Sequence, residues 1–266
     1  MTPDASLFVR IGIPGLALAV LAIVLFAVQR VLREPRTTLK LGALATLWLA
    51  YAALLAHSGL LARSDLQPPA MLLLFVPLLA LSATFAFSGP GTRLAEHTPL
   101  RWLVALHAFR FPLELVMHEA AREGVMPEQM TFTGASFDIL SGLAGAALAL
   151  GWNALRDQRA WAWAFNVLGS ALLLAIICIA VASLPAFQLF GSEPERQNTW
   201  VAHFPYVWLP AGLVTAALSG HLLLWRRLLT ETRSRQVPSR NAATLTGLDL
   251  VCDSRGAAEA SRSGQM

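Results

Sequence analysis

The chain of 266 residues is too apolar for an ordinary soluble domain. Hydrophobic residues make up 56% of it and charged residues 14%, and the mean hydropathy is +0.56. The net charge of +4 is spread over short segments between apolar stretches, without a nucleic-acid-binding motif, so we expect no nucleic-acid partner. Cys178 lies in an apolar stretch and Cys252 near the C-terminus, which predicts neither a disulfide nor a thiolate metal site. The composition indicates an all-α, multi-pass membrane protein.

Seven apolar stretches follow one another along the chain. They cover residues 7–29, 41–62, 69–88, 102–118, 139–155, 160–190 and 201–225. Most are close to the roughly 20 residues that a helix needs to cross a bilayer. They predict seven transmembrane helices in one membrane domain, residues 1–230, surrounded by lipid. Residues 231–266 are rich in Ser, Arg, Ala and Gly, which predicts a disordered tail.

The distribution of Lys and Arg predicts the orientation of these helices. If seven helices cross the membrane, fifteen of the 20 basic residues fall on one side and four on the other, with Arg110 inside a helix. The four are Arg10, Arg63, Arg122 and Arg196. Because basic loops are retained in the cytoplasm, we expect the N-terminus outside and the C-terminal tail in the cytoplasm.

The fourth stretch carries charge at membrane depth. Arg110 is followed by Glu114 and His118 at four-residue steps, which places all three on one face of a helix. Pro112 lies between them and predicts a kink. Such charges are costly in a membrane and need a partner or a function. One interpretation is an ion pair of Arg110 with Glu114, with Asp138 as a second acceptor; the other is anion binding by Arg110 or proton exchange by Glu114.

The predicted topology places several polar residues in the outer half of the membrane, with Arg110 deeper. They predict a pocket that opens towards the periplasm. Its expected lining residues are Arg110, Glu114, His118, Asp138, His57 and His203. Four of these are also candidate ligands for zinc, copper or iron, because imidazole and carboxylate suit these metals: His118, Glu114, Asp138 and His203. The alternative is that the histidines are interfacial residues bonded to loops or water.

Two further features concern packing and anchoring. Ser141, Gly145 and Ala149 recur at four-residue steps in the fifth stretch, which allows a neighbouring helix to approach closely. His221 lies five residues before Arg226, and we expect it at the inner membrane interface.

Three segments resemble a pattern found in uncharacterised bacterial multi-pass inner-membrane proteins. They are FRFPLELVMH at 109–118, MTFTGASFD at 130–138 and HFPYVWLP at 203–210. The resemblance implies location in a bacterial inner membrane. Seven spans, an outside N-terminus and scattered His, Asp and Ser also resemble the alkaline ceramidase and adiponectin-receptor superfamily, which implies an intramembrane zinc hydrolase. The His-x-x-x-His of that superfamily's closing span is missing here, since His203 and His221 are eighteen residues apart.

These patterns leave three functions open. The first is binding or transport of a small solute, ion or proton in a pocket facing the periplasm. The second is a metal-dependent intramembrane hydrolase, with a base and ligands drawn from the residues above. The third is a non-catalytic subunit of a membrane assembly. No motif shows whether the protein is an enzyme or which cofactor it binds. A homo-oligomer is possible, and no motif indicates one.

Overall fold

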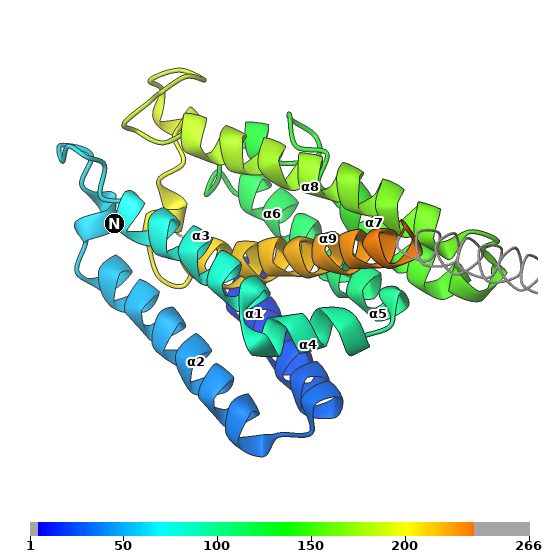
Figure 1. Cartoon of the computed structure of the whole chain (residues 1–266). Coiled ribbons are helices and arrows are strands. Elements are labelled where there is room, and N and C mark those ends of the chain that lie inside the picture. Colours follow the sequence, from blue (N-terminus) through cyan, green and yellow to red (C-terminus); the bar gives the residue numbers. More distant parts are fainter. Residues whose placement is uncertain (1–4, 237–266) are drawn as a thin grey trace, which may run out of the picture. The chain divides into compact units, whose positions relative to one another are not determined.

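The computed structural model describes residues 5–236, and within this range the chain is helical and contains no strand (Figure 1). The α-helices are α1 (Leu7–Leu32), α2 (Pro35–His57), α3 (Leu72–Phe87), α4 (Gly89–His97), α5 (Leu100–Ala105), α6 (Arg110–Arg122), α7 (Ile139–Gly151), α8 (Gln158–Ala182) and α9 (Thr215–Gln236). Short helical turns are η1 (Leu60–Ala62), η2 (Leu106–Phe109), η3 (Glu128–Met130), η4 (Trp152–Ala154), η5 (Pro194–Arg196), η6 (Trp200–Ala202) and the π-helical η7 (Leu209–Val214). The chain divides into compact units at Arg226 and Arg227, and the packing below belongs to the first. Residues 237–266 of the predicted tail lie outside the described range.

The expectation of an all-helical protein is confirmed. Three helices, α1, α2 and α8, are long and apolar enough to cross a membrane, and the pair α3 and α4, bent by 62°, raises this to four among the described residues. The fourth predicted stretch is not one continuous helix, because α5, η2 and α6 follow one another there. The break lies in η2, before Pro112, and Pro112 itself is accommodated in the first turn of α6, where its missing N–H removes no helical bond.

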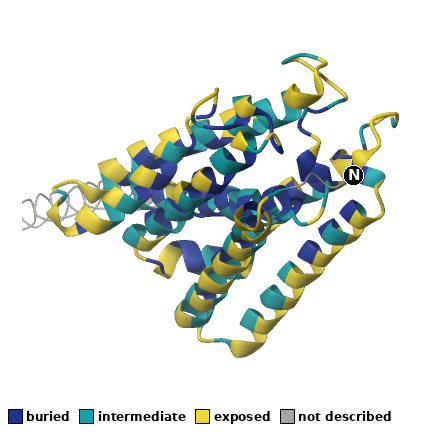
Figure 2. Ribbon diagram, turned by 180° about the vertical axis from the view of Figure 1, so that it is seen from behind, coloured by how far each residue is buried: buried dark blue, intermediate teal, exposed yellow. Residues whose placement is uncertain are grey.

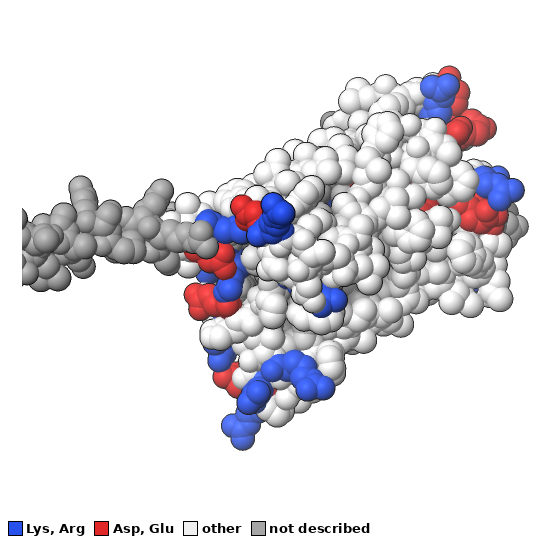
Figure 3. All heavy atoms as spheres, turned by 90° about the vertical axis from the view of Figure 1, so that its right-hand side faces the viewer, with Lys and Arg blue, Asp and Glu red and all other residues white. Residues whose placement is uncertain are grey.

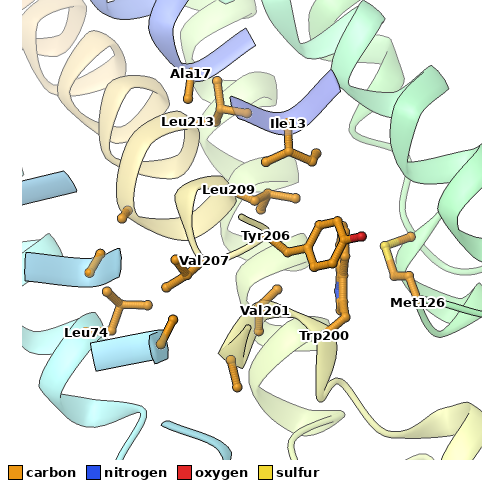
Figure 4. Packing of buried hydrophobic residues seen from close by; sticks show 14 of the residues in the cluster. Ile13, Ala17, Leu74, Met126, Trp200, Val201, Tyr206, Val207, Leu209 and Leu213 are labelled. Carbon is orange, nitrogen blue, oxygen red and sulfur yellow. The ribbon is translucent and has the colours of Figure 1, made fainter. Parts of the chain in front are cut away.

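The apolar core gathers around Trp200 and Tyr206. Their rings are 5.1 Å apart between centroids, and Figure 4 shows Tyr206 beside Trp200, with Ile13 of α1 and Leu209 of η7 close by. Trp200, Tyr206 and Ile13 are almost completely buried. Burying side chains of this size contributes about 1.5–3 kcal/mol each, so this cluster ties α1 to the segment before α9.

Two tryptophans tie α2 to the same segment. The indole N–H of Trp48 donates to the carbonyl of Ala211 at 2.7 Å, and that of Trp208 donates to the carbonyl of Leu49 at 3.1 Å. In a π-helix each hydrogen bond spans five residues instead of the four of an α-helix. Within this π-helix, the carbonyl of Ala211 accepts its hydrogen bond from Trp48 on the neighbouring helix α2.

The outward surface of these helices is apolar. In Figure 2 the exposed residues run along the outer sides of the helices, and on α2 they include Leu39, Leu47 and Leu54. Figure 3 shows a face on which charged side chains gather towards two ends, with a mainly uncharged band between them. Extended apolar surface of this kind is unusual for a soluble monomer and is compatible with insertion into a membrane.

Helix α7 packs unusually closely on the start of α6. A Cβ atom added to Gly142 would lie 2.2 Å from the backbone nitrogen of Phe111, and one on Gly145 would lie 3.2 Å from the carbonyl oxygen of Val104. Backbone atoms cannot turn aside as a flexible side chain can. The close approach expected from Ser141 and Gly145 is confirmed, and Gly142 is its tightest point.

We expect Gly142→Ala to destabilise the protein by about 2–3 kcal/mol, because the added methyl group overpacks against fixed backbone. The measurement is thermal unfolding in detergent micelles, followed by far-UV circular dichroism. Gly15→Ala is the matched control, because Gly15 lies on α1 with nothing within 4 Å of its Cβ position; this change should stabilise by about 0.5–1 kcal/mol. Equal effects at both positions would show that α7 does not approach the backbone of α6 as closely at Gly142 as the structure indicates.

An ion pair joins the α1–α2 connection to α4. Glu34 accepts hydrogen bonds from Arg93, at 2.6 and 3.2 Å, and from the hydroxyl of Thr37 at 2.7 Å. The Arg93 hydrogen bonds, followed by that of Thr37, lower the pKa of Glu34 from 4.5 to about 2. A lowered carboxyl pKa stabilises the folded state at pH values above the unfolded pKa, and this contribution is lost as the pH falls through the folded one.

We expect Glu34→Gln to be less stable than the wild type at neutral pH and to lose that difference as the pH falls from 4.5 towards 2. The reason is that the wild-type carboxylate becomes protonated in this window, while glutamine does not titrate. Thermal midpoints in detergent over this pH series provide the measurement. A difference that stays constant down to the lowest pH would contradict the assignment.

Candidate functional site

Arg110 and Asp138 form a buried ion pair between α6 and the start of α7. Arg110 is the first residue of α6 and is 1% exposed; Asp138 immediately precedes α7 and is 5% exposed. The Arg110 Nε donates to Asp138 Oδ2 at 2.7 Å, and a terminal guanidinium nitrogen donates to Oδ1. This fork-to-carboxylate arrangement is the geometry in which Arg binds a carboxylate most strongly. Asp138 therefore uses both oxygens on Arg110 and does not cap α7.

The remaining terminal nitrogen of Arg110 reaches α8 and α9. It donates to the carbonyl of Gly169 at 3.3 Å and lies 3.2 Å from His221 Nε2. On the far side of that ring, His221 Nδ1 lies 2.7 Å from Asn166 Oδ1, while Asn166 Nδ2 donates to the carbonyl of His221 at 3.4 Å. The amide orientation makes Oδ1 the acceptor, so Nδ1 carries the imidazole proton and Nε2 is free to accept from Arg110.

His107 of η2 completes this cluster. Its ring stacks on His221 with centroids 3.9 Å apart, and it meets Phe165 edge-on at 5.5 Å. His107 is completely buried, and neither ring nitrogen has a hydrogen-bond partner among the described residues. Gly169 makes room for the stack, because a Cβ atom there would lie 2.6 Å from the Cε1 atom of His221. We call Arg110, Asp138, Asn166, His107 and His221 the buried polar cluster.

Glu114 lies one turn after Arg110 and lines a narrow cavity. The cavity has a volume of about 50 Å³, and Arg110, Glu114 and Asp138 line it together with mainly apolar side chains from α6, α8, η7 and α9. Glu114 is 1% exposed, and its Oε2 has no hydrogen-bond partner in the described part of the chain. Asp138 and Glu114 are thus two carboxyls at one cavity, of which Asp138 alone is paired with Arg110.

The prediction that Arg110 pairs with Glu114 is wrong for the described residues 5–236. Arg110 pairs with Asp138 instead. The reason is geometric. Glu114 shares α6 with Arg110, whereas Asp138 approaches from another segment and meets both donors of the guanidinium fork at once.

The three predicted pocket histidines lie elsewhere. His118 stacks on Phe132 at 4.7 Å, and His57 stacks on Phe204 at 5.4 Å. His203 precedes this Phe204 and is partly buried. None of the three lines the cavity beside Glu114.

The four candidate metal ligands are therefore dispersed. Within residues 5–236, no three His, Cys, Asp or Glu side chains are grouped closely enough to hold a metal ion.

Sequence reasoning missed the histidines of the buried polar cluster. His221 was expected at the membrane interface, but it is 2% exposed and packs inside the protein. The signal for His107 was its position three residues before Arg110. Residues three apart are neighbours on a helix surface, as residues four apart are, so His107 belongs to the same face as Arg110. The signal for Asn166 and His221 was weaker, because neither residue continues a row of charged residues at helical spacing in its apolar stretch.

Fold and site together define an all-helical protein with three or four helices that could cross a membrane and a polar cluster in its interior. A family model, described as a domain of unknown function (DUF8737), matches residues 67–229, more than half of the chain, and the chain belongs to this family. Neither a curated protein nor a solved structure matches it. The resemblance to ceramidases and adiponectin receptors is thus without support from these comparisons. All five residues of the buried polar cluster fall within the matched segment.

We expect Arg110→Met and Asp138→Asn each to destabilise the protein by about 3–5 kcal/mol, because each leaves a buried charge without its partner. The double variant should lose less than the sum, because both charges are then gone. Unfolding in detergent of the four proteins of this cycle measures the coupling. The exposed pair Arg63–Asp65, with side chains 56% and 64% exposed, is the control, and Arg63→Met and Asp65→Asn should change stability little. Strict additivity at Arg110 and Asp138 would contradict the pair.

Proposed function

We propose that this protein crosses a bacterial inner membrane seven times and that Glu114 takes up and releases a proton inside it. The observation that carries the proposal is the Glu114 side chain: it is buried, one of its oxygens has no partner in the part of the chain that the structure describes, and it lines a small cavity. Ionisable residues within membrane segments commonly mark proton or ion pathways. This narrows the small solute, ion or proton considered from the sequence to a proton.

The arrangement of the helices supports seven crossings. Beside α1, α2 and α8, the proposal needs four further crossings, for which we assign α3 with its bent partner α4, the run α5–η2–α6, α7, and η7 with α9. Of these four, the pair α3 and α4 is apolar and long enough to cross if it counts as one bent span. If the chain crosses once in each of these seven segments, Arg33, Arg93 and Arg159 fall at ends of crossings on the same side of the membrane. By the positive-inside rule that side is cytoplasmic, and the N-terminus is outside. The charge-poor band in Figure 3 is the surface that lipid would cover.

The charges at the cavity favour a proton as the bound species. Arg110 contributes one positive charge and Asp138 one negative charge, and their ion pair balances. An ionised Glu114 would add one uncompensated negative charge in apolar surroundings, which is costly. A proton on Glu114 removes this charge without requiring any movement of the ion pair. Proton binding therefore switches the site between net charges of −1 and 0.

The size of the cavity favours the same species. A pocket for an organic ligand usually has a volume of about 300–1,000 Å³, whereas this one has about 50 Å³. Water fits into such a space, since a site for one water molecule needs only about 10–15 Å³. The cavity in this conformation is therefore suited to protons and water rather than to an organic solute.

The buried polar cluster has a different part in this proposal. Its hydrogen bonds link α6, the start of α7, α8 and α9, so it fastens the helices around the cavity and keeps Arg110 occupied. This fastening is also what a non-catalytic membrane subunit would need. Proton uptake at Glu114 distinguishes the two functions, because a purely structural protein has no use for it.

We expect infrared difference spectra between alkaline and mildly acidic pH, both above the pH of about 4 at which exposed carboxylates titrate, to contain the carbonyl band of a protonated carboxylic acid when recorded on the protein in liposomes. Glu114→Gln should remove this band, because glutamine cannot take up a proton. It should also abolish proton flux measured with a pH-sensitive dye inside the liposomes. Asp65→Asn, at an exposed carboxylate, is the control and should keep both signals. A band that persists in Glu114→Gln, or no band in the wild type, would refute the proposal.

A further inference from the structure

We propose that the cavity beside Glu114 is a water-binding site and that Asn198, on the loop between α8 and η6, is the residue through which it communicates with that outer loop. This inference deepens the proposed function and rests on it. It names the ligand of the cavity and the side from which protons reach Glu114. The observation behind it is a second buried oxygen without a partner, on the wall of the same cavity.

The orientation of the Asn198 amide is fixed by its neighbours. Asn198 is 2% exposed, its Nδ2 donates to the carbonyl of Ala180 at 3.0 Å, and its backbone N–H donates to the carbonyl of Ser183 at 2.7 Å. A rotated amide would bring Oδ1 against the Ala180 carbonyl, and two acceptors repel each other. Oδ1 is therefore on the other side of the amide, where it has no partner among the described residues.

Two residues that line the cavity thus each carry a buried oxygen for which the described part of the chain offers no donor. Four of its lining residues have polar side chains, namely Arg110, Glu114, Asp138 and Asn198. Arg110 is occupied by Asp138, Gly169 and His221, which leaves Glu114 Oε2 and Asn198 Oδ1. Burying an acceptor without a donor costs about 1–3 kcal/mol. Water donates two hydrogen bonds, and we therefore infer that water bound in the cavity supplies the donors that these two oxygens lack.

The rest of the cavity wall offers a proton no other polar contact. Its other lining residues, such as Leu173, Ile177 and Leu213, are apolar. Asn198 is directly followed by the exposed Thr199 and preceded by the exposed segment 192–196. A proton that leaves Glu114 by a polar route within this cavity therefore passes the water and Asn198 to reach solvent at the loop.

Isotope exchange at Glu114 tests this route. When the protein film is transferred from H2O to D2O, the carboxylic acid band of Glu114 shifts at the rate at which exchangeable hydrogen reaches it. We expect Asn198→Leu to slow this shift about tenfold or more, because leucine is close in size to asparagine but has no polar side-chain atom. Losing one hydrogen bond along the path changes a rate by about this factor. Thr199→Val is the matched control, because it removes a polar group from the next position outside the cavity; it should leave the rate unchanged.

Two further variants guard against misfolding of Asn198→Leu, which also loses the bond to Ala180. Ala180→Leu fills the cavity from its wall and keeps the Asn198 side chain, and it should slow the exchange as well. Asn198→Asp, as the protonated acid in this buried position, can donate its O–H to the Ala180 carbonyl and keeps its other oxygen, so it should exchange as fast as the wild type. Unchanged exchange in folded Asn198→Leu and Ala180→Leu, or equal slowing in Thr199→Val, would overturn the route. A wild type that lacks the Glu114 band would instead refute the proposed function.

Discussion

The interior of this protein depends on the ion pair between Arg110 and Asp138. A guanidinium cannot lose its charge, so once Arg110 is buried it must be neutralised and its donors must be satisfied. The structure meets this demand with three elements: the carboxylate before α7, a carbonyl of α8 and the imidazole of α9. Because each partner belongs to a different segment, the position of one charge constrains how α6, α7, α8 and α9 can pack.

This constraint also gives two similar carboxyls different roles. Asp138 and Glu114 line the same cavity, but the two oxygens of Asp138 are used by the fork of Arg110, while Oε2 of Glu114 has no partner among the described residues. The environment rather than the residue type distinguishes the paired counter-ion from the unpaired carboxyl oxygen. Arg110 supplies the separation, because one side of its fork binds Asp138 while its remaining terminal nitrogen is used by Gly169 and His221.

The sequence predicted the parts of this arrangement that follow from local spacing. Arg110 and Glu114 belong to α6 at the expected interval, and Asp138 could be identified because a buried charge requires a partner. The choice of Asp138 over Glu114 depends on the approach of α7 to α6, which Gly142 permits. The stack of His107 on His221 depends on a contact between residues 114 positions apart. Helical periodicity carries no information about such distant pairs.

The family match separates the polar interior from the apolar shell. The matched segment, residues 67–229, begins after α2 and includes every residue of the buried polar cluster, Glu114 and Asn198. Helices α1 and α2 precede it and contribute apolar packing, such as Ile13, and the indole bond of Trp48 to η7. The same η7 supplies Leu209 and Leu213 to the cavity wall. Although α2 has no side chain in the cavity, it supports a segment that forms its wall. The apolar shell and the cavity beside Glu114 are therefore connected through the π-helix.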